Sequence, residues 1–319
     1  MAEPAELSTD PSVLRGRLPA TGVWMTAFTG RSAAAVREAA AAVERMGWRA
    51  WWGGEAPFNR DVFTGSALAL EATSSLVVLT AVANIYARDP MAMKSGALTL
   101  GDAYPGRFGL GIGVSHASLV GHRGHAYGKP LQAMRAYLDA MAEAHYVPPP
   151  PAEPVPLLLA ALRPRMLDLA RERSAGSHTY FVGVAHTESA REALGPEPFL
   201  APELMFVLDP DPDSARARVR RALTPYLENF PNYVDNLRRF GYGEGDFRDG
   251  GSDRLVDDLV AWGGAEEIGD RVRAHLDAGA DHVCLQPLVG SLDRALAQLE
   301  ELAPELTAIS TSGGSSAVR

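Results

Sequence analysis

The sequence is poor in the features that mark secreted and membrane-spanning proteins. Its single cysteine, Cys284, cannot form an internal disulfide and suits a reducing compartment. No apolar run approaches the ~18 residues that a transmembrane helix needs. The N-terminus shows no basic start followed by an apolar core, so no signal peptide is evident. These absences predict a cytoplasmic protein.

The chain also lacks the charge and the loops that bind nucleic acids or nucleotides. Its formal net charge is −9 and its basic residues are scattered, which argues against nucleic acid or a membrane surface as a partner. Gly109, Gly111 and Gly113 have the spacing G-x-G-x-G, not the G-x-G-x-x-G of a dinucleotide site, and no P-loop motif occurs. We therefore expect a small-molecule substrate.

Metal ligands are sparse as well. His116, His122 and His125 lie in or beside one polar loop, with no nearby cysteine or cluster of acids. Zinc needs three or four ligands with a supporting shell. The H-x-H motif expected on the first strand of barrel metallohydrolases is absent, and Cys284 lies in an apolar run typical of packing. We expect no metal site.

The sequence does contain a regular alternation of strand-like and helical segments. The strand-like segments are 22–28, 48–54, 76–86, 108–114, 155–161, 178–184, 203–208 and 281–287. The connection after the seventh is long and partly helical. Eight units over about 290 residues favour one (β/α)8 TIM barrel, an α/β fold, over a doubly wound open sheet. We expect the barrel over residues 20–309, a loose arm over 1–19 and a disordered tail over 310–319.

The stretch Tyr104–His116 carries the clearest indication of a site. Pro105-Gly106 is typical of a turn, and glycine then alternates with large apolar residues. Glycines in a strand let a flat ligand or another backbone approach closely, so tight packing between strands explains them as well. Ser115 and His116 follow at the carboxyl end of this strand, where α/β barrels build their sites.

Several segments resemble the luciferase-like monooxygenase superfamily, and within it an actinobacterial subgroup of F420-dependent oxidoreductases. They are Leu79–Pro90, Tyr104–His116, Gly124–Leu131, Met134–Ala140 and Leu162–Leu167. The resemblance covers residues 21–289. It implies a barrel that holds a flat isoalloxazine-type ring at its strand ends, with a non-proline cis peptide at Ala81-Val82. It also implies a homodimer, for which helices around 67–70 and 91–98 offer an isologous interface.

The activity implied by this resemblance is hydride transfer between the deazaflavin coenzyme F420 and a small organic substrate at the barrel mouth. An FMN-dependent monooxygenase on the same barrel, served by a partner reductase and oxygen, is the alternative. A non-catalytic barrel that binds a flavin or another ligand is a third hypothesis.

Two residues are predicted to be catalytic. Glu55 ends the second strand, where related deazaflavin enzymes carry an acid, and is placed to hydrogen-bond the ring edge or to shuttle a proton. Sugar-phosphate dehydrogenases of the superfamily follow that acid with histidine, and Ala56 stands here, which weighs against oxidation of a sugar alcohol. His116 ends the fourth strand, where those dehydrogenases carry glutamate, and its imidazole titrates near neutrality.

Nine further residues are predicted to contact the cofactor. Ala81 and Val82 would form a bulge behind the ring, as the resemblance implies. Arg163, at a helix N-terminus, would bind an anionic tail. The others, which would flank the ring, its ribityl chain or the tail, are Asn84, Val114, Ser115, Tyr127, Ala161 and His178.

Overall fold

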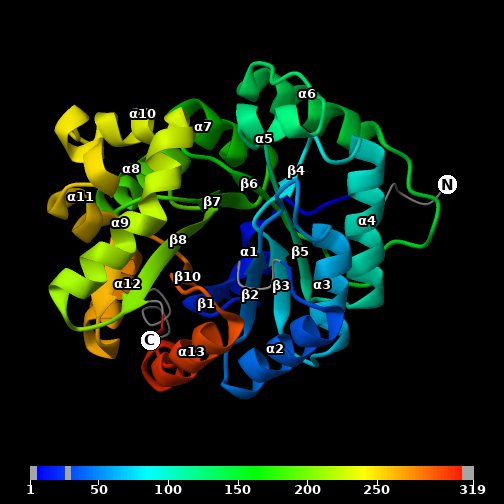
Figure 1. The fold of residues 1–319 in the computed structure, drawn as a ribbon. Helices are drawn as coiled ribbons and strands as arrows, with labels where there is room; N and C mark the ends of the chain where they lie inside the picture. Colours follow the sequence, from blue (N-terminus) through cyan, green and yellow to red (C-terminus); the bar gives the residue numbers. More distant parts are fainter. Residues whose placement is uncertain (1–5, 26–29, 311–319) are drawn as a thin grey trace, which may run out of the picture.

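A closed barrel of parallel strands forms the centre of the computed structural model, which describes residues 6–25 and 30–310 (Figure 1). The barrel strands are β1 (Thr21–Trp24), β2 (Ala50–Gly53), β3 (Val77–Thr80), β5 (Phe108–Gly113), β6 (Leu157–Ala160), β7 (Gly176–Thr179), β8 (Phe199–Leu208) and β10 (Val283–Pro287). Strand β10 pairs in parallel with both β8 and β1, which closes the barrel. The predicted (β/α)8 barrel is confirmed.

Two short strands extend this barrel. Strand β4 (Ala83–Asn84) follows β3 after a cis peptide at Ala81-Val82 and pairs with β5. The cis peptide lies where the family resemblance placed it. Strand β9 (Val260–Gly263) pairs with the second half of β8. We did not predict β9, because its four residues follow a helix directly and show no strand period of their own.

Helices surround the strands (Figure 1). They are α2 (Ala33–Arg45), α3 (Val62–Glu71), α4 (Pro90–Ala103), α6 (Pro130–Glu143), α7 (Pro164–Arg173), α8 (Val184–Leu194), α12 (Ala265–Asp277) and α13 (Leu292–Leu306). The side chains of Ser32, Asp61 and Asp89 cap their helices by accepting the backbone N–H three residues on. Within the described ranges, none of the helices is long and apolar enough to cross a membrane.

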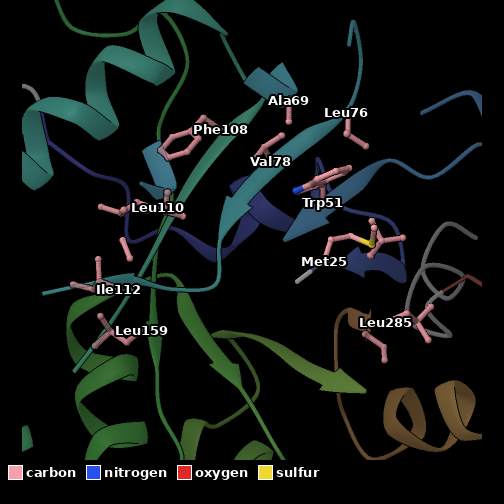
Figure 2. Close-up of a cluster of buried hydrophobic side chains, with 14 of the residues drawn as sticks. Met25, Trp51, Ala69, Leu76, Val78, Phe108, Leu110, Ile112, Leu159 and Leu285 are labelled. Atoms are coloured by element: carbon pink, nitrogen blue, oxygen red, sulfur yellow. The ribbon is translucent and has the colours of Figure 1, made fainter. Parts of the chain in front are cut away.

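A continuous apolar layer lies between the strands and these helices (Figure 2). Outward side chains such as Trp51, Val78 and Leu110 are buried in it, together with Ala69 of α3. Side chains alternate along each strand, so the neighbouring residues point into the barrel. The layer holds the strand ends in place, and with them the residues that follow.

Strand β5 contributes glycines that lie close to the chain around the cis peptide. A Cβ on Gly111 would lie 2.2 Å from the Thr80 carbonyl oxygen, and one on Gly113 would lie 2.5 Å from Cγ2 of Val82. The glycines therefore let β5 lie directly against the chain around the cis peptide. Tight packing between strands therefore accounts for these glycines. Gly113 also lines the cavity described below, and the approach of a flat ligand to it stays a prediction.

Residues 6–19 are packed, so the loose arm expected there is wrong for this stretch. Helix α1 (Pro11–Arg15) buries Leu14 inside the barrel, and the Ser8 N–H donates to the Val155 carbonyl at 2.7 Å. Arg15 is paired with Asp281 at 2.9 Å. The segment closes the N-terminal end of the barrel, because Leu14 and Leu18, four residues apart, complete its core. Of the expected tail, residues 311–319 lie outside the described residues, as does the expected strand end at 26–28.

The long connection after the seventh barrel strand is confirmed. It contains α9 (Pro212–Asn229), α10 (Pro231–Arg239), a 3-10 helix η1 (Glu244–Gly250) and α11 (Asp253–Leu259) before β9. These elements share one apolar cluster with the end of β8. A shorter helix, α5 (Ala117–His122), follows β5. Both segments lie at the carboxyl ends of the strands.

The helices expected at a dimer interface bury most of their apolar residues against their own barrel. Leu70, Met93 and Leu98 are buried, whereas Met91 is 59% exposed. The homodimer stays a prediction.

We predict that Gly111→Ala lowers the stability of the barrel. The added Cβ would meet the Thr80 carbonyl oxygen, and overpacking of this kind costs about 1–3 kcal/mol. Gly121→Ala in α5 is the matched control, because no neighbouring group lies within 4 Å of its added Cβ. Thermal unfolding should show a lower midpoint for the first variant and an unchanged or higher one for the second. Equal midpoints would contradict the close approach of the two strands.

Candidate active site

A cavity of about 960 Å³ lies at the carboxyl ends of the barrel strands, between the strand ends, α5 and the long connection. All of the residues predicted for the site line it. They are Glu55, Ala81, Val82, Asn84, Val114, Ser115, His116, Tyr127, Ala161, Arg163 and His178. The structure thus brings the predicted residues together, while their individual roles stay predictions.

Glu55 is bound on both carboxylate oxygens. Its Oε1 accepts from Nη2 of Arg88 at 2.6 Å, and its Oε2 accepts from Nη1 of Arg88 at 3.0 Å and from the Asn84 N–H at 2.8 Å. The side chain is only 3% exposed. A bidentate pair of this kind is strong and geometrically specific. These contacts favour an anchoring role for Glu55, which holds the chain directly after the cis peptide.

The second acid at this edge of the cavity is also held by Arg88. Oδ2 of Asp61 accepts from Nη2 of Arg88 at 2.6 Å, and Oδ1 of Asp61 caps α3 through the Thr64 N–H. The Tyr137 hydroxyl in turn donates to the Arg88 carbonyl at 2.9 Å. Arg88 therefore neutralises the acidic groups of the rim and ties α3 to the segment after β4.

His116 lies between the cavity and α10. Its Nδ1 is 3.0 Å from Oδ1 of Asn232, so Nδ1 carries the proton and Nε2 is the acceptor of the neutral ring. The ring packs on Phe230 and Tyr233, with centroids 4.2 and 5.2 Å away. Burial lowers the pKa of His116, and the hydrogen bond to Asn232 only partly opposes this shift. At neutral pH the ring is therefore uncharged and able to accept a proton.

The turn after β5 places His116 and Val114 at the cavity. Ser115 has a φ of 58°, in the left-handed region that non-glycine residues seldom occupy. The Tyr127 hydroxyl donates to the Ser115 carbonyl at 3.2 Å. Burial raises the pKa of Tyr127 to about 12, so this hydroxyl keeps its proton at neutral pH. The bond fastens the loop after α5 to the end of the strand.

Arginine side chains ring the mouth. Those that line the cavity are Arg60, Arg163, Arg165 and Arg239. Arg163 is the N-cap residue of α7, its side chain is 45% exposed, and its Nη2 lies 3.9 Å from Oδ2 of Asp235. Glu55 and Asp61 are paired with Arg88, and Arg163 with Asp235, so Arg60, Arg165 and Arg239 are left without an acid partner among the described residues. This excess of positive charge suits an anionic group at the start of α7.

The aromatic wall of the cavity was missed by the sequence analysis. Tyr226 and Tyr233 belong to α9 and α10, and Phe230 joins these helices. The Tyr226 hydroxyl lies 2.8 Å from that of Tyr180. The aromatic residues at 226, 230 and 233 recur at helical spacing, which was the available signal. Nothing in that spacing indicates that they face a site on a distant strand end.

A buried carboxylic acid lies inside the barrel on β8. Glu203 is 1% exposed, its Oε2 accepts from the Phe181 N–H at 3.3 Å, and its Oε1 has no partner among the described residues. Burial raises the pKa of Glu203 to about 8, so the group is protonated at neutral pH. Its register partner on β10 is Cys284, whose thiol pKa is also raised by burial. A buried, protonated thiol suits packing, as expected for Cys284.

The histidines of the α5 loop do not converge on one point. His122 packs against Phe58 and His125 against Tyr86, with ring centroids 5.3 and 6.3 Å apart. Within residues 6–25 and 30–310, no three His, Cys, Asp or Glu side chains are grouped so as to hold a metal ion.

A parallel barrel with a polar-rimmed cavity at its strand ends is the architecture of TIM-barrel enzymes. Residues 17–282 match the luciferase-like monooxygenase family, and the chain belongs to this family. The resemblance seen in the sequence is thus confirmed for the family, while the F420-dependent subgroup stays a prediction.

Solved structures share the fold at low sequence identity. The chain is similar to an F420-dependent secondary alcohol dehydrogenase in complex with an F420–acetone adduct, with a TM-score of 0.71 and 18% identity over 90% of this chain and 98% of that one. It is similar to the coenzyme F420-dependent tetrahydromethanopterin reductase of Methanopyrus kandleri, with a TM-score of 0.71 and 19% identity over 90% of this chain and 99% of that one. The chain is also similar to the oxygenating constituent of 3,6-diketocamphane monooxygenase of Pseudomonas putida in complex with FMN. The TM-score is 0.65, and the identity is 18% over 90% of this chain and 99% of that one. At these identities the likeness shows the fold alone.

We predict that Glu203→Gln reduces the dependence of stability on pH. The folded-state pKa of about 8 lies above the ordinary carboxyl value of 4.5, so between these values only the unfolded chain loses the proton. Wild-type stability should therefore fall as pH rises through this window, by up to about 1.4 kcal/mol per pH unit.

The measurement is thermal unfolding at pH 5, 6.5 and 8. The difference between the unfolding midpoints of Glu203→Gln and wild type should rise steadily with pH, because the glutamine side chain has the shape of glutamate and does not titrate. Glu188→Gln, at an exposed position of α8, is the matched control and should show a constant difference. A constant difference for Glu203→Gln as well would mean that the buried acid is not protonated in the folded state.

Proposed function

We propose that the protein is an oxidoreductase that transfers hydride between coenzyme F420 and a small organic substrate bound at the barrel mouth. The observation that carries the proposal is a cavity with a neutral, unprotonated His116 Nε2 on one side and four arginines in its lining, of which Arg163 alone has an acid partner among the described residues. Family membership supports the reaction class, and the dependence of two structurally similar enzymes on F420 supports the choice of this coenzyme.

The residues present fit a flat ring with an anionic tail. The cavity is large enough for a three-ring system, since ligand pockets typically measure ~300–1,000 Å³. Gly113 and Ala81 add no bulky side chain to the lining, and a Cβ at position 113 would collide with Val82. Arg163, at the start of α7, would hold the tail.

When bound, a deazaflavin supplies or accepts the hydride. The chain's own residues then have three tasks. His116 Nε2 accepts a proton from a substrate hydroxyl, or returns it, while Nδ1 stays bonded to Asn232. Glu55 and Arg88 fix the backbone at Asn84, and with it one side of the ring pocket. The wall of Tyr226, Phe230 and Tyr233 keeps water from the substrate.

An FMN-dependent monooxygenase is the second candidate. It is favoured by the FMN bound in the similar 3,6-diketocamphane monooxygenase structure, and the arginines at the mouth also suit a phosphate. In that case a separate reductase and oxygen would be required.

We predict that the purified protein binds F420 more tightly than FMN. The extended positive rim offers several arginines to a long anionic tail, whereas a single phosphate engages fewer of them. Parallel fluorescence titrations with F420 and FMN measure both dissociation constants. FMN that binds at least about tenfold more tightly, a difference of about 1.4 kcal/mol, would favour the monooxygenase.

We predict that His116→Ala slows turnover by ~10² or more, because proton transfer by a positioned side chain typically contributes this much. Cofactor affinity should change by less than about tenfold, since stacking and backbone contacts hold the ring. His125→Ala, on the same loop but away from the cavity lining, is the matched control and should keep normal turnover. Normal turnover in His116→Ala would remove its proton-transfer role and favour a non-catalytic binding barrel.

A further inference from the structure

The aromatic wall of the cavity packs on the residues that directly follow β7. The ring of Phe181 stacks on that of Tyr226, with centroids 4.9 Å and planes 17° apart, and lies 5.0 Å from that of Tyr233. Tyr226 and Tyr233 line the cavity, whereas Phe181 is 2% exposed and is not part of the lining. Phe181 therefore supports the wall without reaching the cavity.

The residue before Phe181 holds Tyr226 by its hydroxyl. The Tyr180 hydroxyl donates to Oε1 of Gln286 at 3.0 Å, since an amide oxygen can only accept. The Tyr180 oxygen is therefore the acceptor for the Tyr226 hydroxyl, which lies 2.8 Å away. Tyr226 is thus held at its ring by Phe181 and at its hydroxyl by Tyr180.

These two contacts depend on an unusual backbone conformation at Phe181. In an extended strand consecutive side chains point to opposite faces, but here the side chains of Tyr180 and Phe181 both contact Tyr226. The φ of Phe181 is 62°, in the left-handed region, where a bulky side chain is an outlier. Such a conformation persists only where the surrounding contacts hold it.

A buried side chain supplies one of these contacts. The register of β7 with β8 ends at Thr179 and Pro202, so the regular ladder stops before Phe181. The Phe181 N–H instead donates to Oε2 of Glu203, the next residue on β8, at 3.3 Å. Glu203 is 1% exposed, and an N–H left unpaired in such surroundings is costly. Glu203 therefore stabilises the left-handed conformation.

We infer that Glu203 is a positioning residue for the aromatic wall: by accepting the Phe181 N–H, it holds the conformation that brings the Phe181 ring against the wall. The bond needs only an acceptor oxygen, so the neutral form of the acid suffices. The inference deepens the proposed function and rests on it in one respect, namely that the wall faces the substrate. The fit of the substrate is then set from inside the barrel as well as by the long connection.

The test compares Glu203→Met, which removes the acceptor, with Glu203→Gln, which keeps an acceptor oxygen at the same reach. The protein is labelled with 3-fluorotyrosine and observed by fluorine NMR, and the resonances of Tyr226 and Tyr233 are assigned by replacing each with phenylalanine. Glu203→Met should move both resonances by more than their linewidth, because the Phe181 ring leaves the stack. Glu203→Gln should leave both at their wild-type positions.

Phe181→Gly is the second variant, and it also serves if Glu203→Met does not fold. Glycine adopts the left-handed conformation freely, so the backbone is kept while the ring is lost, and both resonances should move. Adding Glu203→Met to Phe181→Gly should cause no further change, because the acid acts through the Phe181 ring.

Thr187→Val is the matched control. The Thr187 hydroxyl is buried and lies 2.8 Å from Nδ1 of His275, and neither residue lines the cavity. Loss of a buried hydrogen bond at this distant position should leave both resonances in place.

Each outcome decides for or against the inference. Unchanged resonances in Glu203→Met or in Phe181→Gly would overturn it, and so would equal shifts in Glu203→Met and Glu203→Gln. The same shifts in Thr187→Val would assign them to a general loss of stability and would also overturn it. Fluorescence titration of the wild type with F420 and FMN tests the proposed function separately. If neither binds, the proposed function is wrong, while the NMR result still decides the role of Glu203.

Discussion

The cavity depends on how closely β5 lies against the chain between β3 and β4. The Thr80 hydroxyl donates to the Gly111 carbonyl at 2.7 Å and accepts from the Gly111 N–H at 2.8 Å. The Thr80 side chain thus makes the hydrogen bonds that backbone groups make elsewhere between neighbouring strands. Only glycine permits this approach, because a Cβ at position 111 would collide with the Thr80 backbone. Gly111 and Gly113 also place no side chain inside the barrel. The glycines that allow the strands to lie close together therefore also leave open space at the carboxyl ends of these strands.

Charge is distributed so that the interior is neutral and the mouth is positive. Burial keeps Glu203 protonated and His178 uncharged, because ionising either would place a charge in a low-dielectric interior. At the rim, Arg88 pairs with Glu55 and Asp61, and Arg163 pairs with Asp235, which leaves Arg60, Arg165 and Arg239 without an acid partner among the described residues. A ligand with an uncharged ring and an anionic tail meets a complementary environment at each end, in keeping with the proposed cofactor.

The long connection after β8 completes the site from the other side. It supplies the aromatic wall, and through Asn232 it orients the His116 ring that the β5 turn delivers. The barrel strands thus form the floor and the proposed cofactor pocket, while α9 and α10 face the space left for the substrate. Substrate choice is therefore expected to depend on this connection more than on the strands.

The sequence by itself determined the parts of this protein that local chemistry encodes. Alternation of apolar residues indicated the strands, helix caps and prolines marked the helices, and the strand-end positions of Glu55, Ser115 and His116 indicated the site. The family resemblance added the position of the cis peptide. Each of these signals lies within a few consecutive residues, so no knowledge of the fold was needed to read it.

Only the tertiary structure decided what those residues contact. Arg88 occupies both oxygens of Glu55 from 33 positions away, and Asn232 reaches His116 across 116 positions. Leu14, expected in a loose arm, fills the barrel end instead. The protonation state of Glu203 also depends on the tertiary structure. In the sequence it is an ordinary glutamate, and it becomes a neutral acid because the closed barrel excludes water from it. Such contacts depend on how distant strand ends and loops converge, which a pattern of neighbouring residues does not specify.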